Sequence, residues 1–82
     1  MRIPHELPEE FPEEARFIEQ LSKSNYEFRQ LTAQYDEVNQ HIYRIESEDE
    51  PTTDEVLERL KKRRLKLKDD IAAMLTKLER RM

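Results

Sequence analysis

A seven-residue apolar repeat runs through both halves of this chain and constrains its fold more than any other feature of the sequence. It spans residues 17–45, with one polar member at Ser24, and residues 57–78, with one charged member at Arg64. Apolar residues spaced by three and four form a stripe along one face of an α-helix. The repeat therefore predicts two amphipathic helices.

The prolines mark the ends of these helices. Pro12 suits the first position of a helix, and Pro51 cannot continue one. We expect the first helix over about residues 12–46 and the second over about residues 53–80. Small polar side chains that favour caps and turns interrupt the first repeat, so a kink or brief break is expected near residues 24–25.

Two helices joined by a short turn lie antiparallel, which predicts an all-α, coiled-coil-like helical hairpin. The numbers of facing residues should then sum to 98 or 99, so that Phe28 faces Ile71 and Tyr35 faces Arg64. A cation beside a phenol could fix the register or bind an anion. We expect instead that the Arg64 stem lies along the seam and its guanidinium reaches the edge or stacks on the ring. The predicted seam is Leu21, Phe28, Leu31, Tyr35, Val38, Ile42, Leu57, Leu60, Arg64, Leu67, Ile71, Met74 and Leu78.

The start of the chain differs from the helical part. Residues 1–11 hold prolines and carboxylates without a period, which predicts a flexible acidic N-terminal arm. Residues 12–82 are then expected to form a single helical-hairpin domain. At 82 residues the chain buries too little surface for a large core of its own, so help from a second copy is expected.

A second apolar strip lies beside the seam and suggests which surface a second copy covers. A strip of this kind indicates that another face is buried in an assembly. We expect a homo-oligomer, with a dimer of hairpins forming a four-helix bundle as the favoured form. The candidate oligomer or partner surface is Ile18, Leu65, Ala72 and Leu75.

The basic run "KKRRLKLK" at residues 61–68 predicts a solvated helix face. Residues 1–53 carry 5 basic and 13 acidic side chains, and residues 54–82 carry 10 and 6, so the halves attract when folded together. The register places Arg63 near Asp36, for example. The alternative is a nucleic-acid-associated regulator that uses the run, which requires several uncompensated cations on one face. The basic face in that reading is Lys61, Lys62, Arg63, Lys66 and Lys68.

Other functional classes have weak support. The sequence has no cysteine and no glycine, hence no thiol nucleophile and no glycine-rich phosphate loop, and no catalytic triad is legible. His41 with Glu37 one turn earlier is too small a set for a metal site. No apolar run reaches the roughly 18 residues of a membrane span, and no signal peptide is legible at the start. We expect a cytoplasmic protein that is not an enzyme and has no cofactor, metal or membrane partner.

The chain resembles the YdcH family of small bacterial helical proteins. The resemblance rests on "FPEE" at residues 11–14, the pattern from Phe28 to Ile42, and "EVLERLKKRRLKLKDDI" at residues 55–71, and it covers about 70 of the 82 residues. It implies a helical hairpin of uncharacterised function and supplies no catalytic residue. The leading functional hypothesis is a protein–protein interaction or self-association module.

Overall fold

The computed structural model describes residues 3–48 and 50–80, and within these ranges the fold is all-α, as predicted. Parts of the predicted arm, turn and C-terminus at residues 1–2, 49 and 81–82 lie outside the described residues. The elements in chain order are α1 (Leu7–Glu10), a 3₁₀ turn (Pro12–Glu14), α2 (Ala15–Ser24), α3 (Tyr26–Ser47) and α4 (Asp54–Glu79).

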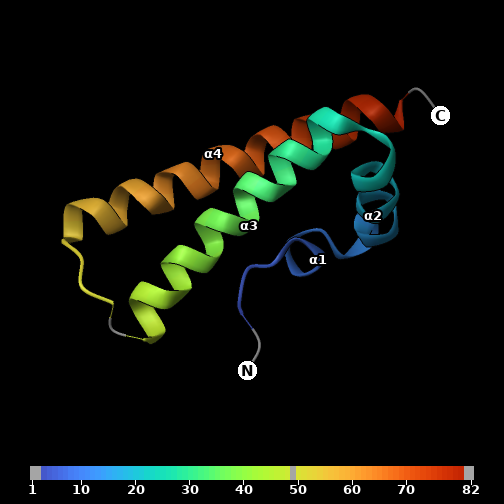
Figure 1. Cartoon of the computed structure of the whole chain (residues 1–82). Helices are drawn as coiled ribbons and strands as arrows, with labels where there is room; N and C mark the ends of the chain where they lie inside the picture. The colour runs from blue at the N-terminus through green and yellow to red at the C-terminus, as the bar shows by residue number, and fades with distance from the viewer. Residues whose placement is uncertain (1–2, 49, 81–82) are drawn as a thin grey trace.

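The two long helices form the predicted hairpin. Helices α3 and α4 run antiparallel and in contact, and they diverge toward the loop that joins them (Figure 1). The Thr53 side chain caps α4 by accepting a hydrogen bond from the Val56 N–H at 3.2 Å. The four largest fully buried side chains all come from the seam, namely Phe28, Tyr35, Ile42 and Ile71. The other predicted seam residues are buried or half-buried.

The predicted break is a sharp corner at Asn25. This residue is extended (φ −125°, ψ 112°), and its side-chain oxygen accepts a hydrogen bond from the Phe28 N–H at 3.0 Å. Its own N–H donates to the Leu21 carbonyl, 2.8 Å away. Asn25 therefore ends α2 and caps α3 in one residue. Helix α2 turns back beside α3 instead of extending it (Figure 1).

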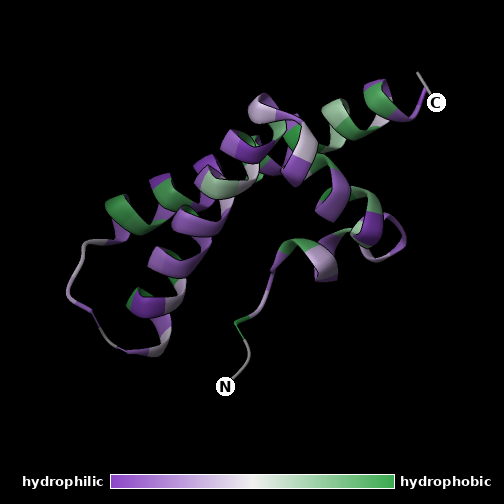
Figure 2. Cartoon of the chain, turned by 45° about the vertical axis from the view of Figure 1, so that its right-hand side comes forward, coloured by the Kyte–Doolittle hydropathy of each residue, from purple (hydrophilic) through white to green (hydrophobic). Residues whose placement is uncertain are grey.

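This corner corrects the predicted oligomer surface. Ile18 and Leu75, assigned from the sequence to that surface, are only 7% and 3% exposed and belong to the core of the same chain. The strip is covered at these two positions, and the cover comes from the chain's own N-terminal part folding back. Ala72 is half-buried, and Leu65 remains 59% exposed. Figure 2 shows hydrophobic and hydrophilic residues recurring along the helices, the pattern of amphipathic helices.

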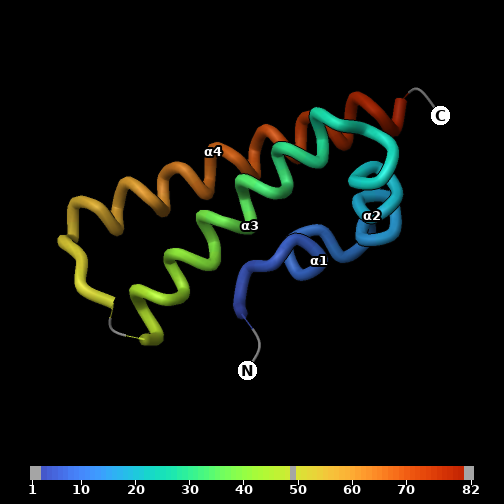
Figure 3. Tube along the Cα trace, in the orientation of Figure 1, coloured from blue at the N-terminus to red at the C-terminus, as the bar shows by residue number. Residues whose placement is uncertain are grey.

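The start of the chain is also folded, contrary to the predicted free arm. Residues 3–11, which we call the N-terminal segment, contain α1 and lie on the same side of the hairpin as α2 (Figures 1 and 3). Leu7 is 4% exposed and joins the hydrophobic core, and Phe11 packs against it. A single buried leucine and its neighbours leave no periodic signal, which is why the sequence pattern missed this packing.

Within residues 3–48 and 50–80, no helix combines the length and apolar character that crossing a bilayer requires.

Candidate functional site

Hydrogen bonds to main-chain carbonyls tie the N-terminal segment to α3. The Tyr35 hydroxyl donates to the His5 carbonyl at 2.6 Å, and the Asn39 amide donates to the Pro4 carbonyl at 3.0 Å. Both donors sit in buried residues on the side of α3 that faces the segment. His5 adopts a positive φ of 64°, an uncommon conformation for a non-glycine residue that these contacts support.

Arg64 joins this network from α4. It is half-buried, and its Nη1 donates to the Asn39 side-chain oxygen at 3.0 Å, so Asn39 links α4 to the N-terminal segment. The guanidinium lies in the neighbourhood of Tyr35, as the register predicted, because both residues line one pocket. Its hydrogen-bond partner is nevertheless Asn39, which the sequence reasoning did not identify.

Two further lysines of the basic run point to the same side of α4 as Arg64. Lys61 pairs with Glu46 of α3 at 3.1 Å. Lys68 pairs with Glu10 at 3.6 Å, and the same Glu10 oxygen lies 3.0 Å from the Nδ1 atom of His5. The inner side of the basic run therefore holds the hairpin and the N-terminal segment together.

These side chains enclose a small depression, which we call the Arg64 pocket. Its volume is about 160 Å³. One wall comes from the N-terminal segment and the other from α3 and α4, so the pocket exists in this form because the segment is docked. It is lined by His5, Glu10, Tyr35, Lys61, Arg64, Leu65 and Lys68.

The surroundings shift the pKa of two groups at this pocket. For Tyr35, burial and the nearby charge of Glu10 raise the pKa to about 12, against a smaller opposing effect of Arg64. The phenol therefore stays protonated at neutral pH and remains a hydrogen-bond donor. For Glu10, partial burial raises the pKa, but the hydrogen bond with His5 and the charge of Lys68 together bring it below its usual value.

A larger pocket of about 470 Å³ lies between α1, α2 and α3. Glu6 and Asp36 both line it, and burial together with the charge of Glu6 raises the pKa of Asp36. This placement corrects the predicted proximity of Asp36 to Arg63. The guanidinium of Arg63 instead donates to the Gln34 side chain at 3.5 Å. Gln34 and Asp36 lie on different flanks of α3, and only Gln34 faces Arg63.

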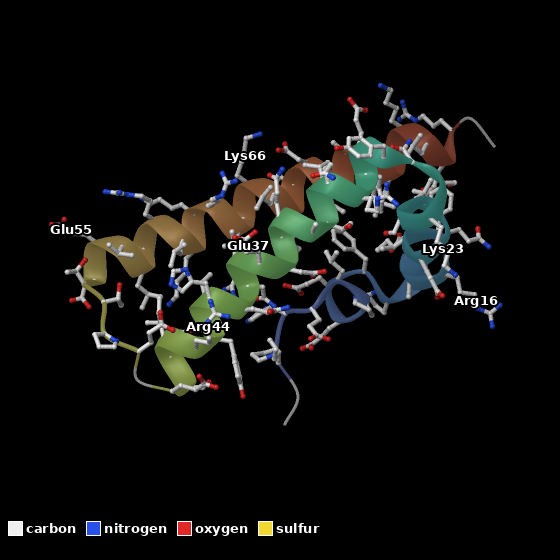
Figure 4. The ribbon with its side chains drawn as sticks, viewed as in Figure 1. Arg16, Lys23, Glu37, Arg44, Glu55 and Lys66 are labelled. Atoms are coloured by element: carbon white, nitrogen blue, oxygen red, sulfur yellow. The ribbon has the colours of Figure 1, made fainter. Side chains whose placement is uncertain are left out.

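The basic run is thus divided between two sides of α4. Lys62, Arg63 and Lys66 are exposed, and Lys66 forms an ion pair with Asp70 at 2.7 Å. The labelled Lys66 side chain points away from the hairpin in Figure 4. Lys61 and Lys68, which the sequence grouped with these residues, are half-buried against carboxylates on the inner side.

The flank of the hairpin opposite α2 carries an apolar depression of about 360 Å³, which we call the Tyr26 face. Tyr26 is 68% exposed, and the Arg29 guanidinium lies 5.6 Å from the centre of its ring. Sequence reasoning missed this surface because Tyr26 lies off the seven-residue repeat. The residues that line it are Tyr26, Glu27, Gln30, Leu31, Gln34 and Met74.

No group of three or more potential metal ligands converges in the described part of the chain.

Among known proteins, a family model described as "Protein of unknown function (DUF465)" matches residues 28–75, which is more than half of the chain. The match begins just after the Asn25 corner and covers the hairpin without α1 and α2. Searches of curated proteins and of solved structures gave no match.

Proposed function

Since the chain belongs to the DUF465 family, whose description assigns no function, we propose from its own surface that it is a non-catalytic protein–protein interaction module that self-associates. We further propose that it is a YdcH-like bacterial protein, which the resemblance of "EVLERLKKRRLKLKDDI" at residues 55–71 supports. A cysteine-free chain without a membrane-spanning helix in its described part is compatible with the cytoplasm, where we propose that it acts.

The observation that carries the proposal is an exposed apolar surface. Tyr26 is 68% exposed, and an apolar depression of about 360 Å³ lies beside it. Exposed aromatic side chains beside a concave surface are typical of protein–protein interfaces. Association of two copies would remove this surface from water.

The Tyr26 face is the surface best suited to this contact. It combines an exposed tyrosine, a methionine and a neighbouring arginine, which are the residue types enriched in interface cores. Charges of both signs lie at or beside this face, with exposed Glu27 and Arg29 on α3, and exposed Arg63 of α4 hydrogen-bonded to Gln34 at its edge. A two-fold axis that places α3 of one copy against α4 of the other brings opposite charges together.

Sedimentation equilibrium across an approximately hundredfold dilution series tests the proposal. We expect a dimer whose dissociation constant rises about tenfold in Tyr26→Ala, the change that loss of about 1.4 kcal/mol produces. Leu65→Ala removes a similarly exposed apolar side chain from the other flank and should leave dissociation unchanged. A constant mass near 10 kDa for the wild-type chain would refute self-association. A larger effect of Leu65→Ala than of Tyr26→Ala would refute the assigned surface.

Nucleic-acid binding ranks second among the proposals. Only Lys62, Arg63 and Lys66 of the basic run face outward, and one of them is already paired with Asp70. Strong salt-dependent binding requires more uncompensated cations than this on one face. Retention on a heparin column at physiological salt would favour the nucleic-acid function over the one proposed above.

A further inference from the structure

Three cationic side chains on the inner side of α4 form a cluster whose positive charge is only partly balanced by carboxylates. Lys61, Arg64 and Lys68 follow one another by three and four residues, a spacing at which like charges on a helix repel. The two lysines have carboxylate partners in Glu46 and Glu10. Arg64 lies between them, and within residues 3–48 and 50–80 its partner is the neutral amide of Asn39, with no carboxylate in ion-pair range.

The pocket geometry directs this unbalanced charge toward one space. The depression has a volume of about 160 Å³ and opens to solvent. Arg64 is half-buried, and its planar guanidinium has five N–H donors, of which Asn39 takes one. Ammonium groups from Lys61 and Lys68 and the ring of His5 line the same space. Glu10 is the one acidic residue among the lining side chains.

We propose that the Arg64 pocket is a binding site for a phosphate-type oxyanion, either inorganic phosphate or the phosphoryl group of a small phosphate monoester. A guanidinium binds two oxygens of such a group in its fork, and the flanking ammonium groups neutralise the remaining charge. A dianion placed beside Arg64 also relieves the repulsion among the three cations.

Binding at this site is coupled to docking of the N-terminal segment. His5 and Glu10 belong to the segment and form one wall of the pocket. An oxyanion that contacts the His5 ring of this wall as well as Arg64 of α4 binds the docked form better than the undocked form. It therefore shifts the equilibrium toward docking. The site lies on the flank opposite the Tyr26 face, so the inference does not rest on self-association.

The test is a titration of the full chain with inorganic phosphate at constant ionic strength, with chloride as the balancing anion. Backbone amide chemical shifts measured by NMR report the site of binding. We expect saturable shifts at residues 5–10 and 61–68, with a dissociation constant in the millimolar range. Arg64→Gln should weaken binding at least tenfold. Arg63→Gln removes the same charge one position away, on the other side of α4, and should change binding less than twofold.

Further arms separate the sources of the signal. If the pocket recognises a phosphoryl group, phosphoserine should bind with a dissociation constant similar to that of inorganic phosphate. If inorganic phosphate binds and phosphoserine does not, the site is specific for the free ion. If Arg64→Gln loses its helical circular dichroism, Lys68→Gln replaces it, with the same expected loss of at least tenfold. Shifts that do not saturate, that follow ionic strength, or that are equally reduced by Arg63→Gln would overturn the site. The phosphate titration and the sedimentation experiment test different surfaces, so a negative result in one does not affect the conclusion from the other.

Discussion

Replacing Tyr35 by phenylalanine tests whether the N-terminal segment is docked as described. The change removes one hydroxyl and leaves the buried ring in place. The lost interaction is the 2.6 Å hydrogen bond to the carbonyl of His5. His5 is exposed, so water can replace the donor at that carbonyl after a small movement. We therefore expect a net loss of about 1 kcal/mol and not the roughly 3 kcal/mol of a buried acceptor left unsatisfied.

Urea unfolding followed by circular dichroism measures this loss as a lower midpoint at unchanged m-value. In thermal unfolding, about 1 kcal/mol lowers the midpoint by roughly 4–8 °C for a domain of this size. Tyr26→Phe is the matched control. Its hydroxyl is on an exposed side chain, so the change should stay within about 0.5 kcal/mol.

Hydrogen exchange shows where the loss acts. The Glu10 N–H is bonded to the Glu6 carbonyl and the Phe11 N–H to the Leu7 carbonyl, so both amides report opening of the segment. In Tyr35→Phe their exchange should accelerate about fivefold, the factor that corresponds to roughly 1 kcal/mol of local opening. Unchanged exchange at both amides, together with an unchanged urea midpoint, would refute the docking hydrogen bond.

Three further predictions concern the core and its titrating groups. Stability should fall by roughly 2–3 kcal/mol between pH 10 and pH 12 in urea titrations, and less in Tyr35→Phe. The reason is that the phenol of the unfolded chain ionises near its ordinary pKa of 10.0, whereas burial raises the pKa in the folded chain to about 12. Partial desolvation and the charge of Glu6 raise the pKa of Asp36, so its ionised form disfavours folding, and solvent screens most of this effect because the side chain is exposed. Asp36→Asn should therefore raise the melting temperature only slightly at pH 7, with the gain disappearing below the unfolded pKa of 3.8. In urea unfolding, Phe28→Ala should lower the free energy of unfolding by about 3–5 kcal/mol and Leu67→Ala by about 2–5 kcal/mol, because both side chains are buried. Lys66→Ala should lower it by less than about 0.5 kcal/mol, because Lys66 is in an exposed ion pair. Equal losses in all three variants would contradict the assigned faces.

The hairpin could be predicted because its packing follows the helical period. The seam residues recur every three or four positions, and the corner at Asn25 coincides with the run of cap-forming side chains. The second strip predicted burial correctly at Ile18 and Leu75 but not at Leu65, which is 59% exposed. A strip shows that a face is covered but carries no information on what covers it. The identity of the cover therefore required the structure.

The Arg64 pocket could be predicted only in part. The register arithmetic brought Arg64 and Tyr35 together, and the two residues do line the same pocket. Asn39 was missed because it reaches Arg64 diagonally, outside the constant sum that defines directly facing positions. The contributions of Pro4 and His5 are main-chain carbonyls, which every residue carries and no side-chain pattern reveals.

The fold-back of the N-terminal segment has a consequence for synthesis on the ribosome. The segment is translated before the hairpin, yet it contacts Lys68 and shares a core with Leu75, both in the C-terminal half of α4. At about 5–20 residues per second, roughly 3–12 s separate the addition of Glu10 from that of Lys68. During this interval Leu7 has no complete core to enter. Burial of the segment is therefore completed only after most of α4 has been made.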